Sequence, residues 1–139
     1  MEKDYKISSA RYYELKYFCL QYHDFKAKIK ENELSGGSKA SYFQNGMSSG
    51  ISNPTMDKVL QQNIYFEYCE LIEQTALIIG GDYGLYQAFL DNVTIGLSYE
   101  HLRALEKIPD HENGKPVIGY VKFYNLRRKF YYLLNFKKI

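Results

Sequence analysis

The clearest pattern of apolar positions lies in residues 8–31. Apolar side chains recur there at intervals of three and four residues, at Leu15, Phe18, Tyr22, Phe25 and Ile29. This spacing places them on one face of an α-helix. Ser8 or Ser9 can cap the start of the helix, and the Ser-Gly-Gly run at 35–37 can end it. We therefore predict one N-terminal helix over residues 8–31.

A second helical pattern follows a segment that has no periodicity. Residues 34–53 are rich in Ser and Gly, so we expect a flexible loop there. Asn53 and Pro54 form a strong helix start, and the helix is expected to run to about Ile79, before two glycines. Its buried side is predicted from five apolar residues, Met56, Leu60, Ile64, Leu71 and Ile72.

Two shorter helices are predicted next. Asp82 can cap a helix over about 83–92, residues 93–97 form a tight connection, and Ser98 is a good N-cap for a helix over 99–107. Because period-two alternation is nearly absent, the predicted class is all-α.

The predicted organisation is a single domain over 1–139. It is a helical bundle with a helical core over 54–108, an extended turn or flap over 109–119, and a C-terminal helix over 120–139.

The last twenty residues contain six basic side chains, four tyrosines and no acid. On a helix, one side is apolar and faces a core: Phe123, Leu126, Phe130, Leu133 and Leu134. Arg127 and Lys129 flank that side, while Lys122 and Arg128 point away from it. Bases at a helix C-terminus can simply complement the helix dipole, but that effect is confined to the last turn, and residues 127–129 lie mid-helix. An anionic partner, above all nucleic acid, is therefore the favoured interpretation, ahead of an acidic protein surface or a solvated face.

Charge is unevenly distributed although the net charge is only +2. Residues 54–96 carry six acids and one base, whereas residues 97–139 carry nine bases and four acids. Aromatic residues reach 17%, with 15 Tyr and 8 Phe. Either an AT-rich coding sequence or a stacking and interface surface would explain this share.

Little in the chain suggests catalysis. Cys19 and Cys69 lie in apolar runs without metal-type spacing, so buried free thiols in a reducing compartment are expected. The N-terminus lacks the apolar stretch of a signal peptide and no run is long enough for a membrane span, so the predicted location is cytoplasmic, without membrane contact. Residues 110–112, Asp-His-Glu, are the one dense acid–imidazole cluster, but they lack spaced His or Cys partners. We expect no metal, no cofactor and no enzyme activity.

Several segments carry a resemblance to known proteins. They are Tyr-Tyr-Glu-Leu-Lys-Tyr-Phe-Cys-Leu-Gln-Tyr at 12–22, Ser-Asn-Pro-Thr at 52–55, Leu-Ser-Tyr-Glu-His-Leu-Arg at 97–103, Ile-Pro at 108–109, and Arg-Arg-Lys-Phe-Tyr-Tyr-Leu-Leu at 127–134 with the preceding Phe-Tyr. The chain resembles small proteins encoded by phages and prophages of Gram-positive bacteria. These are similar to the promoter-recognition domain of sigma factors and to late-transcription activators of the RinA and ArpU type.

The resemblance implies a C-terminal helix-turn-helix-like region that places its last helix in the major groove of double-stranded DNA. It implies a transcriptional regulator working alongside host RNA polymerase or another host protein. It implies Tyr124, Asn125 and Arg128 as residues that contact bases or phosphates. With the other basic positions of the helix, the predicted nucleic-acid-binding residues are Lys122, Tyr124, Asn125, Arg127, Arg128 and Lys129. In the look-alikes the step before the basic helix is short, whereas here residues 110–119 lengthen it.

A second hypothesis is a protein-interaction module, such as an inhibitor of a host nucleic-acid-binding or defence protein. Glu67, Glu70 and Glu73 would then form an acidic helical face that mimics nucleic acid, and the tyrosines would supply contact area.

Overall fold

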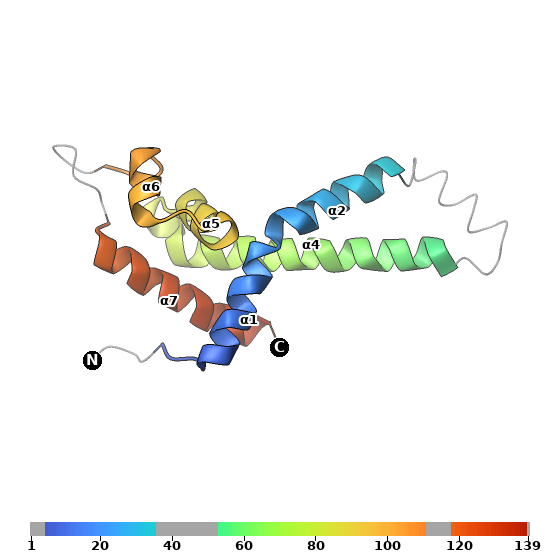
Figure 1. Ribbon diagram of the computed structural model, residues 1–139, viewed down its shortest axis with the longest axis horizontal. Helices are drawn as coiled ribbons and strands as arrows, with labels where there is room; N and C mark the ends of the chain where they lie inside the picture. The colour runs from blue at the N-terminus through green and yellow to red at the C-terminus, as the bar shows by residue number, and fades with distance from the viewer. Residues whose placement is uncertain (1–4, 36–52, 111–117, 139) are drawn as a thin grey trace. The chain divides into compact units, whose positions relative to one another are not determined.

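A computed structural model gives the structure of residues 5–35, 53–110 and 118–138, without the side chains of 33–35, 53–58 and 61–62. Within these residues every regular element is helical, which confirms the all-α class. The order is α1 (Ser9–Leu20), α2 (Tyr22–Ser35), α4 (Asn53–Gly80), the 3₁₀ turn η1 (Gly81–Tyr83), α5 (Tyr86–Ile95), α6 (Tyr99–Ala104) and α7 (Tyr120–Lys137) (Figure 1). The predicted loop at 34–53 lies outside the described residues from 36 to 52, as does the predicted flap from 111 to 117.

The predicted single helix over 8–31 is wrong, because the chain breaks at Gln21 into α1 and α2. Gln21 has φ −87° and ψ 0°, and its N–H donates to the Phe18 carbonyl at 3.1 Å, which tightens the last turn of α1. The break leaves the three-and-four spacing intact, and all five predicted apolar residues are buried. The Ser8 cap is confirmed, since Ser8 Oγ accepts from the Arg11 N–H at 3.1 Å.

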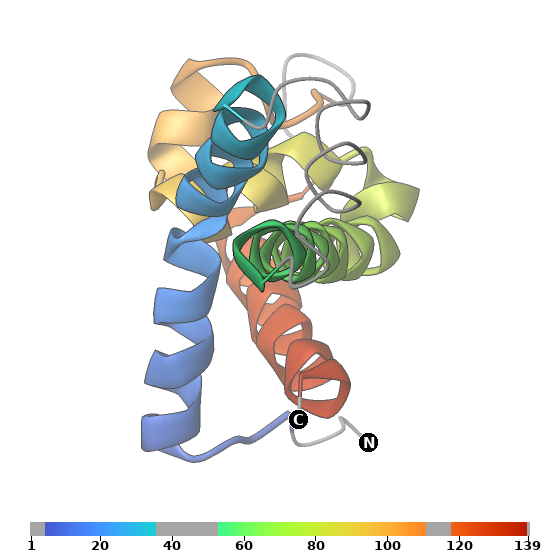
Figure 2. The ribbon, with the colours of Figure 1, turned by 90° about the vertical axis from the view of Figure 1, so that its right-hand side faces the viewer.

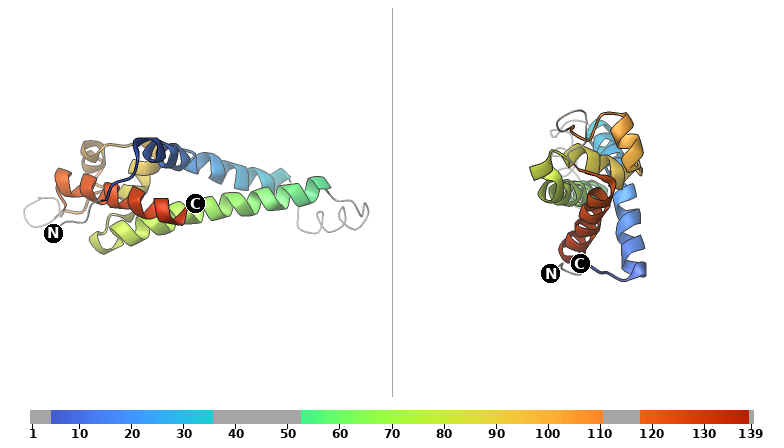
Figure 3. Two further views of the ribbon diagram at one scale, coloured as in Figure 1. Left: turned by 90° about the horizontal axis from the view of Figure 1, so that it is seen from below. Right: turned by 90° about the vertical axis from the view of Figure 1, so that its left-hand side faces the viewer.

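The described chain forms two compact units, residues 22–70 and residues 1–21 with 71–139, and the single-domain organisation stays a prediction. In the first, which we call the hairpin unit, α2 pairs with the first part of α4 (Figure 3). Phe25 of α2 stacks on Tyr65 of α4, with ring centroids 5.7 Å apart. Leu60 and Ile64 were predicted to be buried, which is wrong: both are exposed. Among the described residues of this unit, α2 packs against α4 through the Phe25 ring, which contacts Tyr65 and Tyr68.

The second unit, which we call the main unit, contains α1, the end of α4, α5, α6 and α7. Phe89 of α5 and Phe123 of α7 are fully buried and stack with centroids 4.8 Å apart. A Cβ at Gly80 would lie 2.6 Å from the Phe89 ring, so α4 must end in a glycine for α5 to pack there. The predicted buried side of the C-terminal helix is confirmed at Phe123, Leu126, Phe130 and Leu134, and Leu133 is half-buried.

The predicted short helices are present with shifted ends. The helix predicted over 83–92 begins later, at Tyr86, because Gly84 takes the left-handed conformation (φ +69°). Gly96 (φ +90°) ends it, and Ser98 caps α6 as predicted by accepting from the His101 N–H at 3.2 Å. The helix predicted over 99–107 ends at Ala104. An α6 of six residues leaves the helix-turn-helix-like assignment a prediction.

A buried ion pair fixes the chain after α6. Asp91 of α5 is buried, and its carboxylate accepts from Lys107 Nζ and from Gln87 Nε2. This pair has no signature in the sequence, because each partner lies at an ordinary polar position. The pair links α5 to the segment that follows α6.

Candidate nucleic-acid interface

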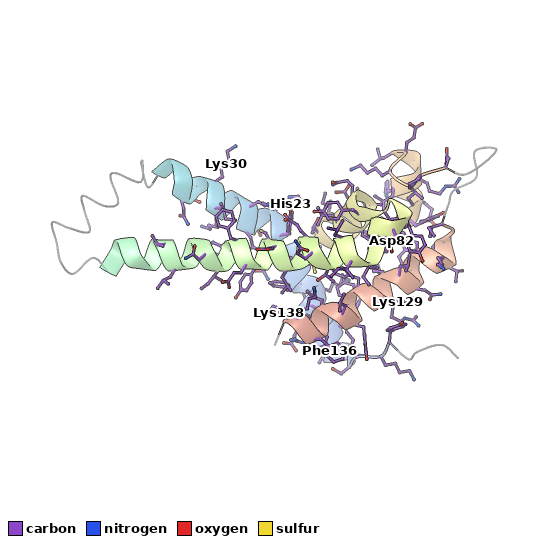
Figure 4. The ribbon with its side chains drawn as sticks, turned by 180° about the vertical axis from the view of Figure 1, so that it is seen from behind. His23, Lys30, Asp82, Lys129, Phe136 and Lys138 are labelled. Atoms are coloured by element: carbon purple, nitrogen blue, oxygen red, sulfur yellow. The ribbon has the colours of Figure 1, made fainter. Side chains whose placement is uncertain are left out.

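All six predicted nucleic-acid-binding residues lie on α7, with two degrees of exposure. Lys122, Asn125 and Arg128 are exposed, whereas Tyr124, Arg127 and Lys129 are half-buried. This agrees with the predicted placement of Lys122 and Arg128 away from the apolar side. Figure 4 shows Lys129 midway along α7.

Tyr124 has a structural partner. Its hydroxyl oxygen accepts a hydrogen bond from the Tyr99 N–H, at the start of α6, with a distance of 3.1 Å. The bond couples α6 to α7 and fixes the Tyr124 ring. The guanidinium carbon of Arg127 lies 4.6 Å from the centroid of that ring, so Tyr124 in turn holds Arg127 in place.

Other cations of this helix region are also placed over aromatic rings. Lys122 Nζ lies 5.6 Å from the Tyr83 ring centroid and Lys129 Nζ lies 5.3 Å from that of Tyr5. Such contacts orient a cation without neutralising it. Among the described residues, ion pairs are formed for example by Arg11, Lys28 and Lys107, but none involves Lys122, Arg127, Arg128 or Lys129. The charges at Lys122, Arg127, Arg128 and Lys129 are therefore not balanced by a described carboxylate.

A groove of about 820 Å³ runs beside α7 within the main unit. One wall consists of five α7 residues, Tyr120, Tyr124, Arg127, Arg128 and Tyr131. The other wall comes from α1 and the segment before it, and includes Lys6, Tyr12 and Tyr13. Six of the lining residues are tyrosines, three are basic and none is acidic. We call this the tyrosine groove.

Arg11 joins the two walls of the tyrosine groove. Its Nε–H donates to Asn135 Oδ1 at 2.7 Å, and Nη2 donates to the Lys138 carbonyl. Both acceptors lie at the end of α7, so these hydrogen bonds link it to the first turns of α1. Figure 2 shows the start of α1 and the end of α7 at the same end of the main unit. At the same place Lys138 Nζ lies 4.7 Å from the Phe18 ring centroid.

The α7 wall of the groove also contains an uncharged residue, Tyr131. Tyr131 is buried and meets Tyr12 edge to face, with centroids 5.1 Å apart. Burial raises the pKa of Tyr131 well above its ordinary value of 10.0, and the nearby Arg127 opposes this only weakly. The hydroxyl therefore stays protonated at neutral pH.

Of the two walls of the groove, only the α7 wall has a pattern in the sequence. Residues 120, 124, 127, 128 and 131 follow helical spacing, so their shared face was detectable. Tyr12 and Tyr13 lie more than one hundred positions away in the chain, and no local pattern links them to α7. Arg11 was missed for the same reason.

The acidic residues of the alternative hypothesis all lie on α4. Glu67 and Glu70 are exposed, and Glu73 is half-buried. Four large apolar side chains of the hairpin unit are exposed on the same helix, Val59, Leu60, Ile64 and Phe66.

The remaining sequence-based expectations concern cysteines, metals and membranes. Cys19 and Cys69 are buried and neither forms a disulfide, as predicted, and burial raises the pKa of Cys19 above its ordinary range. His111 and Glu112 lie outside the described residues, and elsewhere in the described ranges no cluster of His, Cys, Asp or Glu is suited to hold a metal. None of the helices in the described part of the chain is both long and apolar enough to cross a bilayer.

Comparison of the chain with known protein families, with curated proteins and with solved structures finds no match.

Proposed function

We propose that this protein binds DNA through the exposed basic side of α7. The observation that carries the proposal is the set of cations without described carboxylate partners, of which Arg128 and Lys122 are exposed. Phosphates supply most of the binding energy that such a surface can gain. Asn125, also exposed, lies between the two cations in the sequence and offers an amide that can pair with a base edge.

The spacing of these residues supports duplex DNA as the partner. Lys122, Asn125 and Arg128 are separated by three residues each, so they follow one side of the helix over about 9 Å. An α-helix of this kind fits the major groove, where side chains reach base edges and phosphates together. The resemblance to phage and prophage activators supports a role in transcription in the cytoplasm, alongside host RNA polymerase.

The test compares Arg128→Ala with Lys137→Ala. Each variant removes one exposed positive charge from α7, but Lys137 lies in the last turn, outside the proposed contact. Binding to a mixed-sequence duplex is measured by fluorescence anisotropy over a range of salt concentrations. The slope of log K against log salt is negative, and Arg128→Ala should make it shallower by about one. Lys137→Ala should leave the slope unchanged, and equal slopes for the two variants would exclude a direct contact at Arg128.

A second function is favoured by a specific observation on α4. In the hairpin unit, exposed Glu67 and Glu70 lie close in sequence to exposed Ile64 and Phe66. Acidic and large apolar side chains together suit a protein partner that normally holds nucleic acid. A pull-down from host lysate tests this function. Recovery of one stoichiometric protein, lost in the variant Ile64→Ser but kept in Arg128→Ala, would favour it over DNA binding.

A further inference from the structure

We infer that the tyrosine groove binds an unpaired strand of nucleic acid, with phosphates at its arginines and bases on its exposed tyrosines. The inference deepens the proposed function and rests on it, because both require nucleic acid as the partner. It differs in assigning a concave site beside the exposed face of α7 and in naming the state of the strand that fills it.

The phosphate part of the site is Arg127 with Arg128. Arg127 is half-buried and its guanidinium lies over the Tyr124 ring, and among the described residues no side chain or carbonyl accepts a hydrogen bond from it. A guanidinium has five N–H donors in a planar fork that matches a phosphate. Arg128 lines the same groove and adds a second, exposed guanidinium. The geometry therefore offers a phosphate two guanidinium groups, one already held in position by a ring.

The base-stacking part of the site is supplied by Tyr120 and Tyr13, one on each wall. Tyr120 is 55% exposed and Tyr13 is 50% exposed, whereas Tyr131 of the α7 wall is buried. Tyr120 meets the Tyr99 ring edge to face, at 90°, and lies 4.8 Å from the tilted Tyr124 ring, centroid to centroid. Tyr13 is stacked on Tyr17 with centroids 6.3 Å apart, so a base would use the exposed remainder of each ring. Exposed rings beside cations are the combination with which proteins bind unpaired bases and their backbone.

An unpaired strand fits this groove better than a duplex does. Bases inside a duplex stack on one another, so their faces are not accessible to a tyrosine. The volume of about 820 Å³ lies within the usual range of ligand pockets, which suits one or two nucleotides and not the width of a double helix. The α7 wall extends from residue 120 to 131, about 16 Å, so a strand can follow the helix.

The experiment measures anisotropy with three probes: an oligothymidylate of about 12 nucleotides, a blunt duplex of equal length, and thymidine monophosphate as competitor. Tyr120→Ala should weaken binding of the oligothymidylate by about 5- to 150-fold, the usual range for one stacked base. Tyr120→Phe keeps the ring and should bind like the unmodified protein. Phe136→Ala is the matched control, because Phe136 is also an exposed aromatic residue of α7, at 60%, but lies outside the groove. Far-ultraviolet circular dichroism shows that each variant is folded.

The possible outcomes separate this inference from the proposed function. If neither strand nor duplex binds, the proposed function fails and the inference fails with it. If the duplex binds but Tyr120→Ala and Phe136→Ala have equal effects on the oligothymidylate, the groove inference fails and the proposed function stands. If thymidine monophosphate binds as tightly as the oligothymidylate, the ligand is a free nucleotide and the strand assignment is overturned.

Discussion

Replacing Arg11 with alanine should lower the free energy of unfolding by about 2–4 kcal/mol, although arginine is usually a surface residue and Arg11 lies near the start of the chain. Its guanidinium donates to Asn135 Oδ1 and to the Lys138 carbonyl, and it lies 3.6 Å from Glu14 Oε2. A hydrogen bond from a charged donor contributes about 1.5–3 kcal/mol net. The Arg11 side chain is 25% exposed, so both hydrogen bonds are partly shielded from water. Because Glu14 is 66% exposed, its ion pair adds at most about 1 kcal/mol.

Urea unfolding followed by circular dichroism measures this loss. With a denaturant slope of about 2 kcal/mol/M, the midpoint should fall by about 1–2 M. Arg103→Ala is the control, because Arg103 is an exposed arginine of α6 and surface changes of this kind stay within about 0.5 kcal/mol. Arg11→Lys should recover less than half of the loss, since an ammonium cannot reproduce the fork. A midpoint for Arg11→Ala equal to that of Arg103→Ala would refute the role assigned to Arg11.

Three further predictions concern the core of the main unit. Phe89→Ala should lower the free energy of unfolding, measured with urea, by about 3–5 kcal/mol, because it removes a fully buried ring stacked on Phe123. A loss below about 1 kcal/mol would contradict that packing. Lys107→Ala should lower the free energy of unfolding by about 1–3 kcal/mol, because Gln87 is then the one remaining described side-chain donor to the Asp91 carboxylate, and Asp91 is only 5% exposed. The double variant with Asp91→Asn should recover part of that loss, and purely additive effects would contradict the pairing. Tyr131→Phe should reduce the loss of stability above about pH 10. Above that pH the tyrosine is ionised in the unfolded chain but protonated in the folded chain, so the free energy of unfolding falls by up to about 1.4 kcal/mol per pH unit. If the variant and the unmodified protein lose stability equally above that pH, the raised pKa of Tyr131 is contradicted.

The sequence predicts the buried side of a helix well when the apolar residues of that helix form one continuous side. On α7 the apolar side is continuous, and its burial and the exposure of Arg128 follow from spacing alone. The break at Gln21 was not predictable, because a tight turn at one residue preserves the helical spacing on both sides of it. Leu60 and Ile64 have a helical spacing like that of buried residues, so spacing alone does not reveal that they are exposed. Whether they are buried depends on which helices pack against that part of α4.

The candidate site was only half predictable. Arg127 and Arg128 stand out by charge, but the role of Tyr124 depends on the Tyr99 N–H, a backbone group with no sequence signature. The opposite wall of the groove depends on Arg11, whose partners lie more than one hundred residues away. Contacts of that range arise from tertiary packing, which a single sequence does not reveal.

The most direct test of DNA binding is a salt titration of the unmodified protein with mixed-sequence duplex DNA. If Lys122, Arg127, Arg128 and Lys129 all neutralise phosphates, the slope of log K against log salt should be about −3 to −4, and Arg128→Ala should make it shallower by about one. Binding should be clear at about 50 mM salt, where basic DNA-binding surfaces associate even without sequence specificity. Absence of binding at that salt concentration, or binding with a slope near zero, would contradict the account.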